Sequence, residues 1–220
     1  MNIILDIETL PTADPTVRDQ LAARIKPSAA MKKAETIAKW EAEEKPAAID
    51  EAVAKTALDG TYGRLAVLGL MFDDEPLAID ATCGTEKWML ESLMRQIDKR
   101  VTASSRPLWI GHNIHGFDLP FLWKRCVVNQ VRPSPWLPFG VKPWSDRIND
   151  TMLMWDEGRE RRISLDALCA VLGVTTPKGD LDGGKVAQSW QEGRHEEVIG
   201  YCMSDVAATL RCWKRMKFMD

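Results

Sequence analysis

The apolar run RLAVLGLMF, residues 64–72, limits the possible folds of this chain more than any other segment. Its length and near-continuous apolar character predict a buried central strand. Residues 76–81 follow a turn of three acidic residues and predict an antiparallel neighbour. Another apolar run, residues 2–5, predicts a buried strand that opens the fold and ends at Asp6 and Glu8.

Helices and one further strand complete the predicted order. Apolar residues recur at helical intervals in four segments, and strand character returns once. The predicted helices span 85–101, 119–130, 164–172 and 195–217, and the predicted strand spans 107–111. Ser164 fits a helix N-cap, and Gly173 fits the residue after a helix end. This order predicts an α/β fold with a mixed central sheet flanked by helices.

Residues 14–59 differ in character from the rest of the chain. They are rich in Ala, Lys and Glu, have apolar residues at helical intervals, and are interrupted by Pro27 and Pro46. We interpret them as two or three helices inserted after the first strand. With 220 residues and 45% hydrophobic content, residues 1–220 are expected to form a single domain.

Composition argues against several classes of protein. A formal net charge of −3 is not that of a protein that holds duplex DNA by charge alone, so any nucleic acid must be bound locally. No apolar run has the length of a membrane span, and the first residues do not resemble a signal peptide. Five cysteines without regular spacing indicate reduced thiols rather than disulfides or a zinc site. We expect a cytoplasmic protein without a membrane partner.

Asp6 and Glu8 are the first candidate site residues. They stand two apart in a predicted strand, so both side chains leave the same face. Two carboxylates crowded together repel each other unless a cation joins them, and hard divalent cations prefer such oxygen ligands. Because this pair is common, a solvated strand end is the alternative interpretation.

Two further motifs carry acids on predicted helices. Asp118 follows a strand and a glycine turn, from which it can point back at the strand ends, although a helix N-cap explains it equally well. Tyr201 and Asp205 stand four apart on one helix face, where the phenol can reach a water or phosphate beside a metal held by the carboxylate. Taken alone, either residue also fits ordinary packing or a solvated surface.

In this order, the three acidic motifs resemble those of the DEDD exonuclease superfamily. The matching segments are LDIETLPT (5–12), GHNIHGFDLPFL (111–122) and YCMSDVAAT (201–209), with support from SLDALCAVLGV (164–174) and KGDLDGGKVAQSW (178–190). The chain resembles the predicted exonucleases related to the proofreading domain of family-B DNA polymerases. This resemblance covers residues 1–12 and 60–214 and implies an RNase H-like (DnaQ-like) fold.

The residue that stands four or five positions before the last aspartate distinguishes two branches of this superfamily. The DEDDh branch needs a histidine five residues before the last aspartate, where this chain has Gly200. The DEDDy branch needs a tyrosine four residues before it, and Tyr201 is present. His195 is too far upstream to replace it, while His112 and His115 are expected to shape a loop or contact substrate. His112 is assigned no chemistry.

The resemblance implies a metal-dependent 3′-to-5′ exonuclease. Asp6, Glu8 and Asp205 would hold one Mg²⁺ or Mn²⁺ ion, and Asp6 with Asp118 would hold a second. Tyr201 would orient the attacking water, because a phenol pKa of about 10 is too high for the main base at neutral pH. The substrate would be single-stranded nucleic acid, DNA in preference, and the products nucleoside 5′-monophosphates.

Further residues are expected to contact the substrate. By resemblance, Thr9 and Leu10 would meet the terminal nucleotide, and Asn113 and Phe117 its sugar or base. Five basic residues would neutralise phosphates or form only a solvated basic face. These are Lys178, Lys185, Arg159, Arg161 and Arg162.

A long loop, residues 131–144, contains four prolines and two tryptophans and is expected to rim a site. Trp136 and Trp144 would stack there on unpaired bases, although tryptophan packs more often in the core.

Three alternatives remain open at the level of sequence. The enzyme would be an exoribonuclease if its substrate were RNA, since no residue indicates a contact with a 2′-hydroxyl. A catalytically silent nucleic-acid-binding or scaffold domain would normally lack one of the four acids. Residues 14–59 would pack on a second copy of the chain or on a protein partner, or would lie across the substrate.

Overall fold

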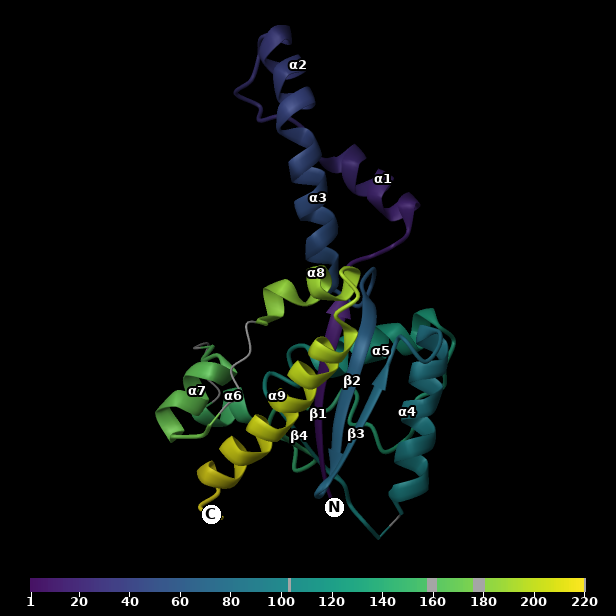
Figure 1. Cartoon of the computed structure of the whole chain (residues 1–220), viewed down its shortest axis with the longest axis vertical. Helices are drawn as coiled ribbons and strands as arrows, with labels where there is room; N and C mark the ends of the chain where they lie inside the picture. The colour runs from purple at the N-terminus through teal and green to yellow at the C-terminus, as the bar shows by residue number, and fades with distance from the viewer. Residues whose placement is uncertain (103, 158–161, 176–180, 220) are drawn as a thin grey trace.

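A five-stranded mixed sheet forms the centre of the molecule, with strands in the order β3-β2-β1-β4-β5 (Figure 1). The strands are β1 Asn2–Leu10, β2 Arg64–Phe72, β3 Glu75–Asp80, β4 Leu108–Gly111 and β5 Ile148–Asp150. β1 pairs antiparallel with β2 and parallel with β4, so it lies in the middle of the sheet. This computed structural model describes all residues except 103, 158–161, 176–180 and 220.

Helices pack on both faces of this sheet. They are α1 Pro15–Arg24, α2 Ala34–Glu43, α3 Lys45–Lys55, α4 Glu86–Arg100, α5 Asp118–Val128, α6 Thr151–Trp155, α7 Leu165–Leu172, α8 Val186–Gln191 and α9 His195–Met216, with 3₁₀ turns η1 Thr56–Leu58 and η2 Gly183–Lys185. α9 crosses β1, β2 and β4 on one face, and α4 and α5 pack on the other. Among the described residues, no helix has both the length and the apolar character that spanning a lipid bilayer requires.

The two faces of β1 carry different side chains. Leu5 and Ile7 belong to the main core together with residues of α4 and α5. Ile4 packs instead against residues of α9. Because side chains alternate along a strand, Asp6 and Glu8 lie on the same face as Ile4. Helix α9 therefore covers the face that carries both acids.

The first strand is longer than its sequence indicates. The prediction that it ends at Asp6 and Glu8 is wrong, because Leu10 still pairs with Arg64 of β2. The register shifts between Glu8 and Thr9, which marks a β-bulge. Both acids therefore lie within a paired strand, where ladder hydrogen bonds fix their backbone positions.

The other predicted elements are confirmed, with ends that match or differ by one or two residues. Ser164 caps α7, since its Oγ accepts a hydrogen bond from the Ala167 amide at 3.2 Å. Gly173 follows that helix with φ of 66°. The sequence did not reveal β5, α6 or α8, which have three to six residues each. Elements of this length are too short to display a periodicity.

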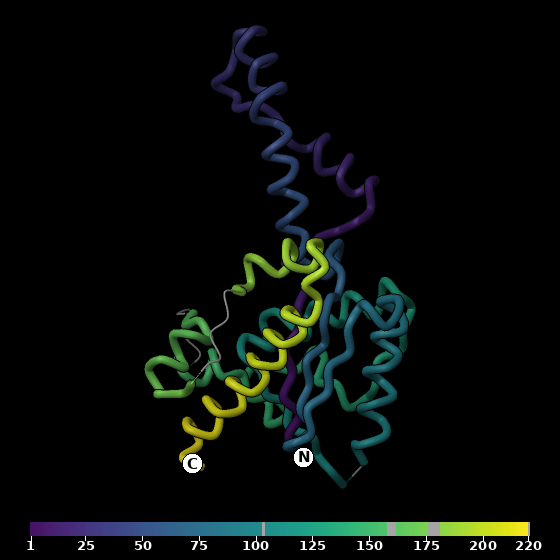
Figure 2. Tube along the Cα trace, in the orientation of Figure 1, coloured from purple at the N-terminus to yellow at the C-terminus, as the bar shows by residue number. Residues whose placement is uncertain are grey.

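Helices α1, α2 and α3 form an arm that projects from one end of the sheet (Figures 1 and 2). The arm, residues 14–59, confirms the predicted helical insertion. Its base is joined to β1: Thr9 Oγ1 donates to the carbonyl of Ala57 at 2.7 Å, and the Thr12 amide donates to Thr56 Oγ1 at 2.8 Å. Helices α1 and α3 contain no buried residue, and α2 buries only Trp40. The arm therefore adds little to the hydrophobic core.

Gly69 of β2 allows α9 to lie close to the sheet. It pairs with Asp6, and a Cβ atom at this position would lie 2.7 Å from Cys202 Sγ and 3.0 Å from Val206 Cγ2. Carbon and sulfur atoms do not approach so closely without displacement, since optimal contacts lie at about 3.5–4.0 Å. Only glycine leaves room for the helix here.

Gly69→Ala is expected to destabilise the protein by about 1–3 kcal/mol, because overpacking forces α9 away from the sheet. Gly200→Ala is the matched control, since a Cβ atom at Gly200 meets nothing within 4 Å and alanine favours a helix by about 0.5–1 kcal/mol. Urea unfolding of both variants measures the two effects. Equal stability of Gly69→Ala and the wild type would show that the contact is not tight.

Candidate active site

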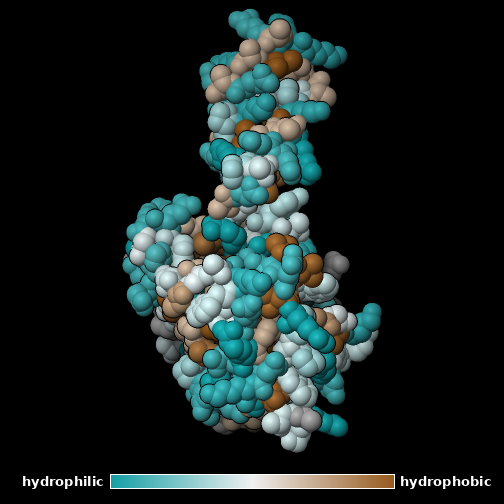
Figure 3. All heavy atoms as spheres, turned by 90° about the vertical axis from the view of Figure 1, so that its right-hand side faces the viewer, coloured by the Kyte–Doolittle hydropathy of each residue, from teal (hydrophilic) through white to brown (hydrophobic). Residues whose placement is uncertain are grey.

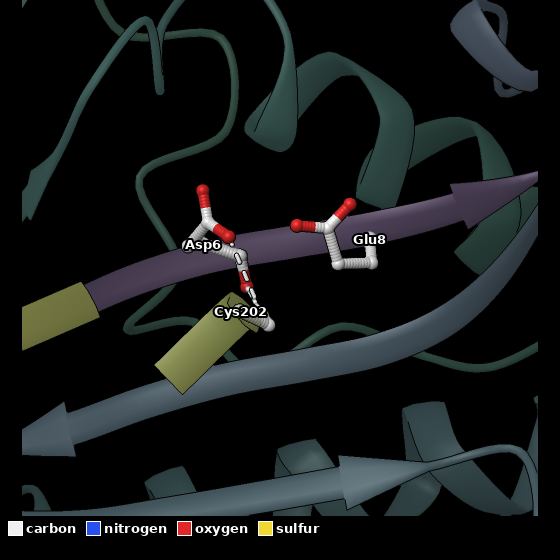
Figure 4. Close-up of side chains that lie close together, drawn as sticks. All are labelled: Asp6, Glu8 and Cys202. Carbon is white, nitrogen blue, oxygen red and sulfur yellow. Dashed lines mark hydrogen bonds between the residues drawn. The ribbon is translucent and has the colours of Figure 1, made fainter. Parts of the chain in front are cut away.

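Two carboxyl groups and a thiol form the centre of the site (Figure 4). One potential ligand atom from each of Asp6, Glu8 and Cys202 lies within 4.8 Å of the other two. The thiol of Cys202, on α9, donates a hydrogen bond to Asp6 Oδ2 at 3.3 Å. Glu8 is nearly buried, with 9% of its surface exposed, and no described residue forms an ion pair or a hydrogen bond with its carboxyl group.

Asp118 approaches this cluster from the start of α5. It is buried, with 3% exposure, and it is the first residue of the helix, so the N-cap is Phe117, which makes no side-chain capping bond. The alternative role of Asp118 as an N-cap is therefore wrong. Hydrogen bonds from the backbone amides of Asp118 and Ile7 lower the pKa of this carboxyl group, but less than burial raises it. The contact with Ile7 joins α5 to β1 beside the two acids.

Tyr201 and Asp205 stand one turn apart on α9, and both are partly buried. Burial raises the pKa of Asp205 to about 6, while a hydrogen bond with Tyr201 acts in the opposite direction. Burial and the charge of Asp205 raise the pKa of the Tyr201 phenol above its ordinary value. The phenol therefore remains protonated near neutral pH and can donate hydrogen bonds.

The charges of Asp118 and Asp205 add to burial in raising the pKa of the two β1 acids, Asp6 and Glu8. The pKa of Glu8 rises to about 8, chiefly through burial and then through the charges of Asp205 and Asp118. Burial also raises the pKa of Asp118 to about 8. For Asp6 the pKa lies well above its ordinary range, because burial adds to repulsion from the other three acids. Three elements that are distant in sequence, β1, α5 and α9, thus bring Asp6, Glu8, Asp118 and Asp205 to one place.

The described residues supply no positive charge that would balance this site. Among the described residues, no lysine, arginine or histidine forms an ion pair with any of the four carboxyl groups. Buried carboxylates are normally paired or coordinate a metal. Oxygen ligands from several carboxylates suit hard divalent cations such as Mg²⁺. The donor set therefore fits a divalent metal, which Asp6, Glu8, Asp118 and Asp205 could hold.

Comparison with known proteins agrees with this arrangement. Residues 68–220 match the model of a family described as predicted 3′-5′ exonucleases related to the exonuclease domain of PolB. The chain belongs to this exonuclease family. The match includes Asp118, Tyr201 and Asp205, and it begins after β1 and the arm. A search of curated proteins found no match.

Family membership and the mixed five-stranded sheet confirm the predicted RNase H-like fold. They also support nuclease activity.

Asp150 is a buried acid that the sequence analysis missed. Its carboxylate accepts hydrogen bonds from the backbone amides of Asn113 at 3.0 Å and His115 at 3.1 Å, and it caps α6 through Met152 at 3.1 Å. These bonds shape the loop that leads into Asp118. An aspartate directly before a helix is a capping signal. This signal could not be recognised in the sequence, because β5 and α6 are too short to be predicted as elements.

Cys202 is the second residue that the sequence analysis missed. Its thiol pKa is raised by burial and then by the charge of Asp6, so the sulfur keeps its proton and serves as a donor. The signal in the sequence was its spacing, because Cys202 stands three residues before Asp205 on the same helix face.

The four residues predicted to contact the terminal nucleotide differ in burial and in their contacts. Thr9 and Leu10 follow Glu8 in β1 and are buried, and the hydroxyl of Thr9 is bonded to the arm. Asn113 adopts φ of 61° in the loop before α5. Phe117 is partly buried, and its ring centroid lies 5.7 Å from that of Phe121.

The predicted phosphate contacts are only partly described. Lys185 lies in η2, with Nζ 3.3 Å from Asp182 Oδ2, and Arg162 is exposed. Lys178, Arg159 and Arg161 lie outside the described residues.

Two histidines near the site stabilise loops. Nδ1 of His112 lies 2.9 Å from Thr151 Oγ1, and its Nε2 lies 2.9 Å from the carbonyl of Ile163. Nε2 of His115 lies 3.1 Å from the carbonyl of Val141. Both rings are thus bonded to the protein itself.

The two tryptophans of the loop 131–144 differ in exposure. Trp136 packs against the core, and its carbonyl accepts a hydrogen bond from Trp109 Nε1 at 3.0 Å. Trp144 is 81% exposed. Of the two rings, that of Trp144 offers the free face that a base could stack on.

Without metal, the protein is expected to lose stability as pH rises. Folding raises the pKa of Glu8 and Asp118 to about 8 and of Asp205 to about 6. These groups therefore stabilise the folded state where they are protonated, and this contribution is lost as pH rises from their unfolded-state pKa of about 4 to their folded-state pKa of about 6 to 8. Urea unfolding in EDTA at about pH 6, 7.5 and 9 measures the loss, and added Mn²⁺ should offset it most at high pH.

The control is the double variant Glu8→Gln and Asp118→Asn, which removes the two groups with a pKa of about 8. Its stability should vary less with pH above neutrality. An identical pH dependence in the variant and the wild type would contradict the assignment of the effect to these acids.

Proposed function

We propose that this chain is a DEDDy-type, metal-dependent 3′-to-5′ exonuclease. Its substrate is the 3′ end of single-stranded nucleic acid, DNA in preference to RNA, and its products are nucleoside 5′-monophosphates. The observation that carries the proposal is the gathering of four carboxyl groups beside a tyrosine phenol, with no balancing cation from the part of the chain that the structure describes. Family membership supports the direction of cleavage.

Asp6, Glu8 and Asp205 would hold one Mg²⁺ or Mn²⁺ ion, and Asp6 with Asp118 would hold a second. When bound, such ions lower the pKa of water toward neutrality and offset the charge that grows on the phosphate and the leaving oxygen. The chain contributes the rigid placement of these acids, because β1 is paired on both sides and α9 is packed against it.

Tyr201 would orient the attacking water by a hydrogen bond. Its raised pKa supports a role as donor rather than base. Two features support the DEDDy branch over the DEDDh branch. Gly200 stands where the DEDDh branch has its histidine, and His195 stacks on Trp190 with ring centroids 4.4 Å apart.

The substrate contacts proposed are Thr9, Leu10, Asn113 and Phe117 for the terminal nucleotide, Lys185 and Lys178 for phosphates, and the exposed Trp144 for an unpaired base. An exoribonuclease is the second candidate, because the resemblance extends to enzymes that process RNA. Free cysteines throughout the chain support a reducing compartment, and we propose the cytoplasm.

Asparagine in place of Asp6, Asp118 or Asp205 keeps the side-chain shape but removes the charge. Each variant is expected to lower the rate of mononucleotide release by about 100- to 1000-fold. Tyr201→Phe is expected to lower it by about 10- to 100-fold, since a residue that orients a ligand contributes less than the ligand itself. Strands of DNA and RNA labelled at the 5′ end, with Mg²⁺, Mn²⁺ or EDTA, report shortening from the 3′ end.

Asp19→Asn serves as the control, because Asp19 is exposed on the arm and makes no ion pair with a described residue. Its rate should equal that of the wild type. If the wild type cuts neither DNA nor RNA with either metal, the exonuclease proposal fails and a nucleic-acid-binding or scaffold role replaces it.

A further inference from the structure

The basic residues of the arm fall into two groups, those that form ion pairs with described residues and those that do not. Residues 14–59 contain eight lysines and arginines. Four of them form ion pairs within the arm, at 2.6 to 3.8 Å. These pairs are Arg18 with Asp50, Lys39 with Glu43, Lys45 with Glu41, and Lys55 with Glu51. Each of these cations therefore has a carboxylate of the arm beside it.

The other four, Arg24, Lys26, Lys32 and Lys33, lie together in residues 24–33, which we name the basic segment. All four are exposed, and none forms an ion pair with a described residue. No acid occurs between Asp19 and Glu35. The arm therefore presents one continuous stretch of uncompensated positive charge.

The fold carries this segment away from the sheet. Helices α2 and α3 follow each other almost in line, and the segment between α1 and α2 runs beside them to the far end of the arm (Figures 1 and 2). A space-filling view shows the arm as a narrow projection, with hydrophilic side chains at its outer end (Figure 3). Residues 34–55 span about 33 Å at the helical rise of about 1.5 Å per residue.

The base of the arm lies beside the candidate active site. Thr9, which donates to Ala57 of the arm, directly follows Glu8. A strand stacked as in a duplex, at about 3.4 Å per nucleotide, would need roughly ten nucleotides to span the distance of about 33 Å from this base to the outer end.

We propose that the basic segment is a binding site for the phosphate backbone of the nucleic acid whose 3′ end occupies the active site. This inference rests on the proposed exonuclease function. The chain has a net charge of −3, and its active site is itself a cluster of acids that repels a polyanion. Lysines and arginines release counterions from phosphates when they bind. In the basic segment no carboxylate stands beside them, whereas each paired cation of the arm has a carboxylate nearby that repels a phosphate. The basic segment thus anchors the strand upstream of the acids.

The structure offers two matched variants to test this site. Replacing Arg24, Lys26, Lys32 and Lys33 by glutamine removes one arginine and three lysines from the basic segment. Replacing Arg18, Lys39, Lys45 and Lys55 by glutamine removes the same set from the ion pairs of the same arm. Both quadruple variants have the same net charge, so a difference between them reports position alone.

Binding of fluorescein-labelled DNA strands of about 6 and about 30 nucleotides is measured by fluorescence anisotropy in EDTA, which prevents metal-dependent cleavage. The basic-segment variant is expected to bind the longer strand about tenfold more weakly or worse at about 0.1 M salt. Its salt slope should fall by about 2.8, because each phosphate contact on a single strand contributes about 0.7. The ion-pair variant should bind like the wild type, and the short strand should not distinguish the proteins.

Equal losses in the two variants, or equal losses for the two strand lengths, would overturn the proposal. A change in oligomeric state of the basic-segment variant with unchanged DNA affinity would overturn it in favour of a protein partner. The outcome is separate from that of the proposed function, which is tested by cleavage with Mg²⁺ or Mn²⁺. Strand binding that depends on the basic segment in a protein without cleavage activity would retain this inference and reject the exonuclease.

Discussion

The close contact between α9 and the sheet at Gly69 is the interaction on which the candidate active site depends. Gly69 stands opposite Asp6 in the ladder, and Cys202 of α9 fills the space that a side chain would take. Because Tyr201 and Asp205 lie within one turn of Cys202, the same contact brings them to β1. This packing contact thus determines which polar groups meet, and a helix farther from the sheet would separate Asp205 from Asp6 and Glu8.

This contact brings several carboxyl groups together in a buried region, where their negative charges repel one another. The protein resolves a similar conflict differently elsewhere: Glu86 is also largely buried, but Arg125 pairs with it at 2.5 Å and Asn129 donates to it at 2.9 Å. No such partner serves the acids beside β1 among the described residues. A buried carboxylate without a partner destabilises a fold. This difference therefore indicates that the acids beside β1 bind a ligand of positive charge. A divalent cation is the group that fits four oxygen donors.

Much of the fold could be predicted from the sequence, because strands and longer helices leave periodic patterns. The run at 64–72 gave both ends of β2 correctly, and alternation along β1 put Asp6 and Glu8 on one face. Contacts across the fold left no such pattern. Cys202 looked like an ordinary helix residue until the crossing of α9 was known, and Asp150 bonds to amides 35 and 37 residues away. Local signals predict elements, whereas these side-chain partners depend on how the elements pack.

In the arm, too, the sequence does not reveal which side chains pair. The arm also suggests why the proposed strand-binding site would lie apart from the acids that would carry out cleavage. The sequence shows the acid-free stretch between Asp19 and Glu35, but only the folded arm joins Arg18 to Asp50, 32 residues away, while no described residue forms an ion pair with the basic segment. Acids that hold metal ions must sit close to the phosphate, yet they repel the rest of the strand. Charges separated by more than about 10 Å are largely screened at 0.1 M salt. Cations carried on the arm, outside the acidic cluster, therefore attract the strand without neutralising the acids, and the bond between Thr9 and Ala57 fixes the base of the arm beside Glu8.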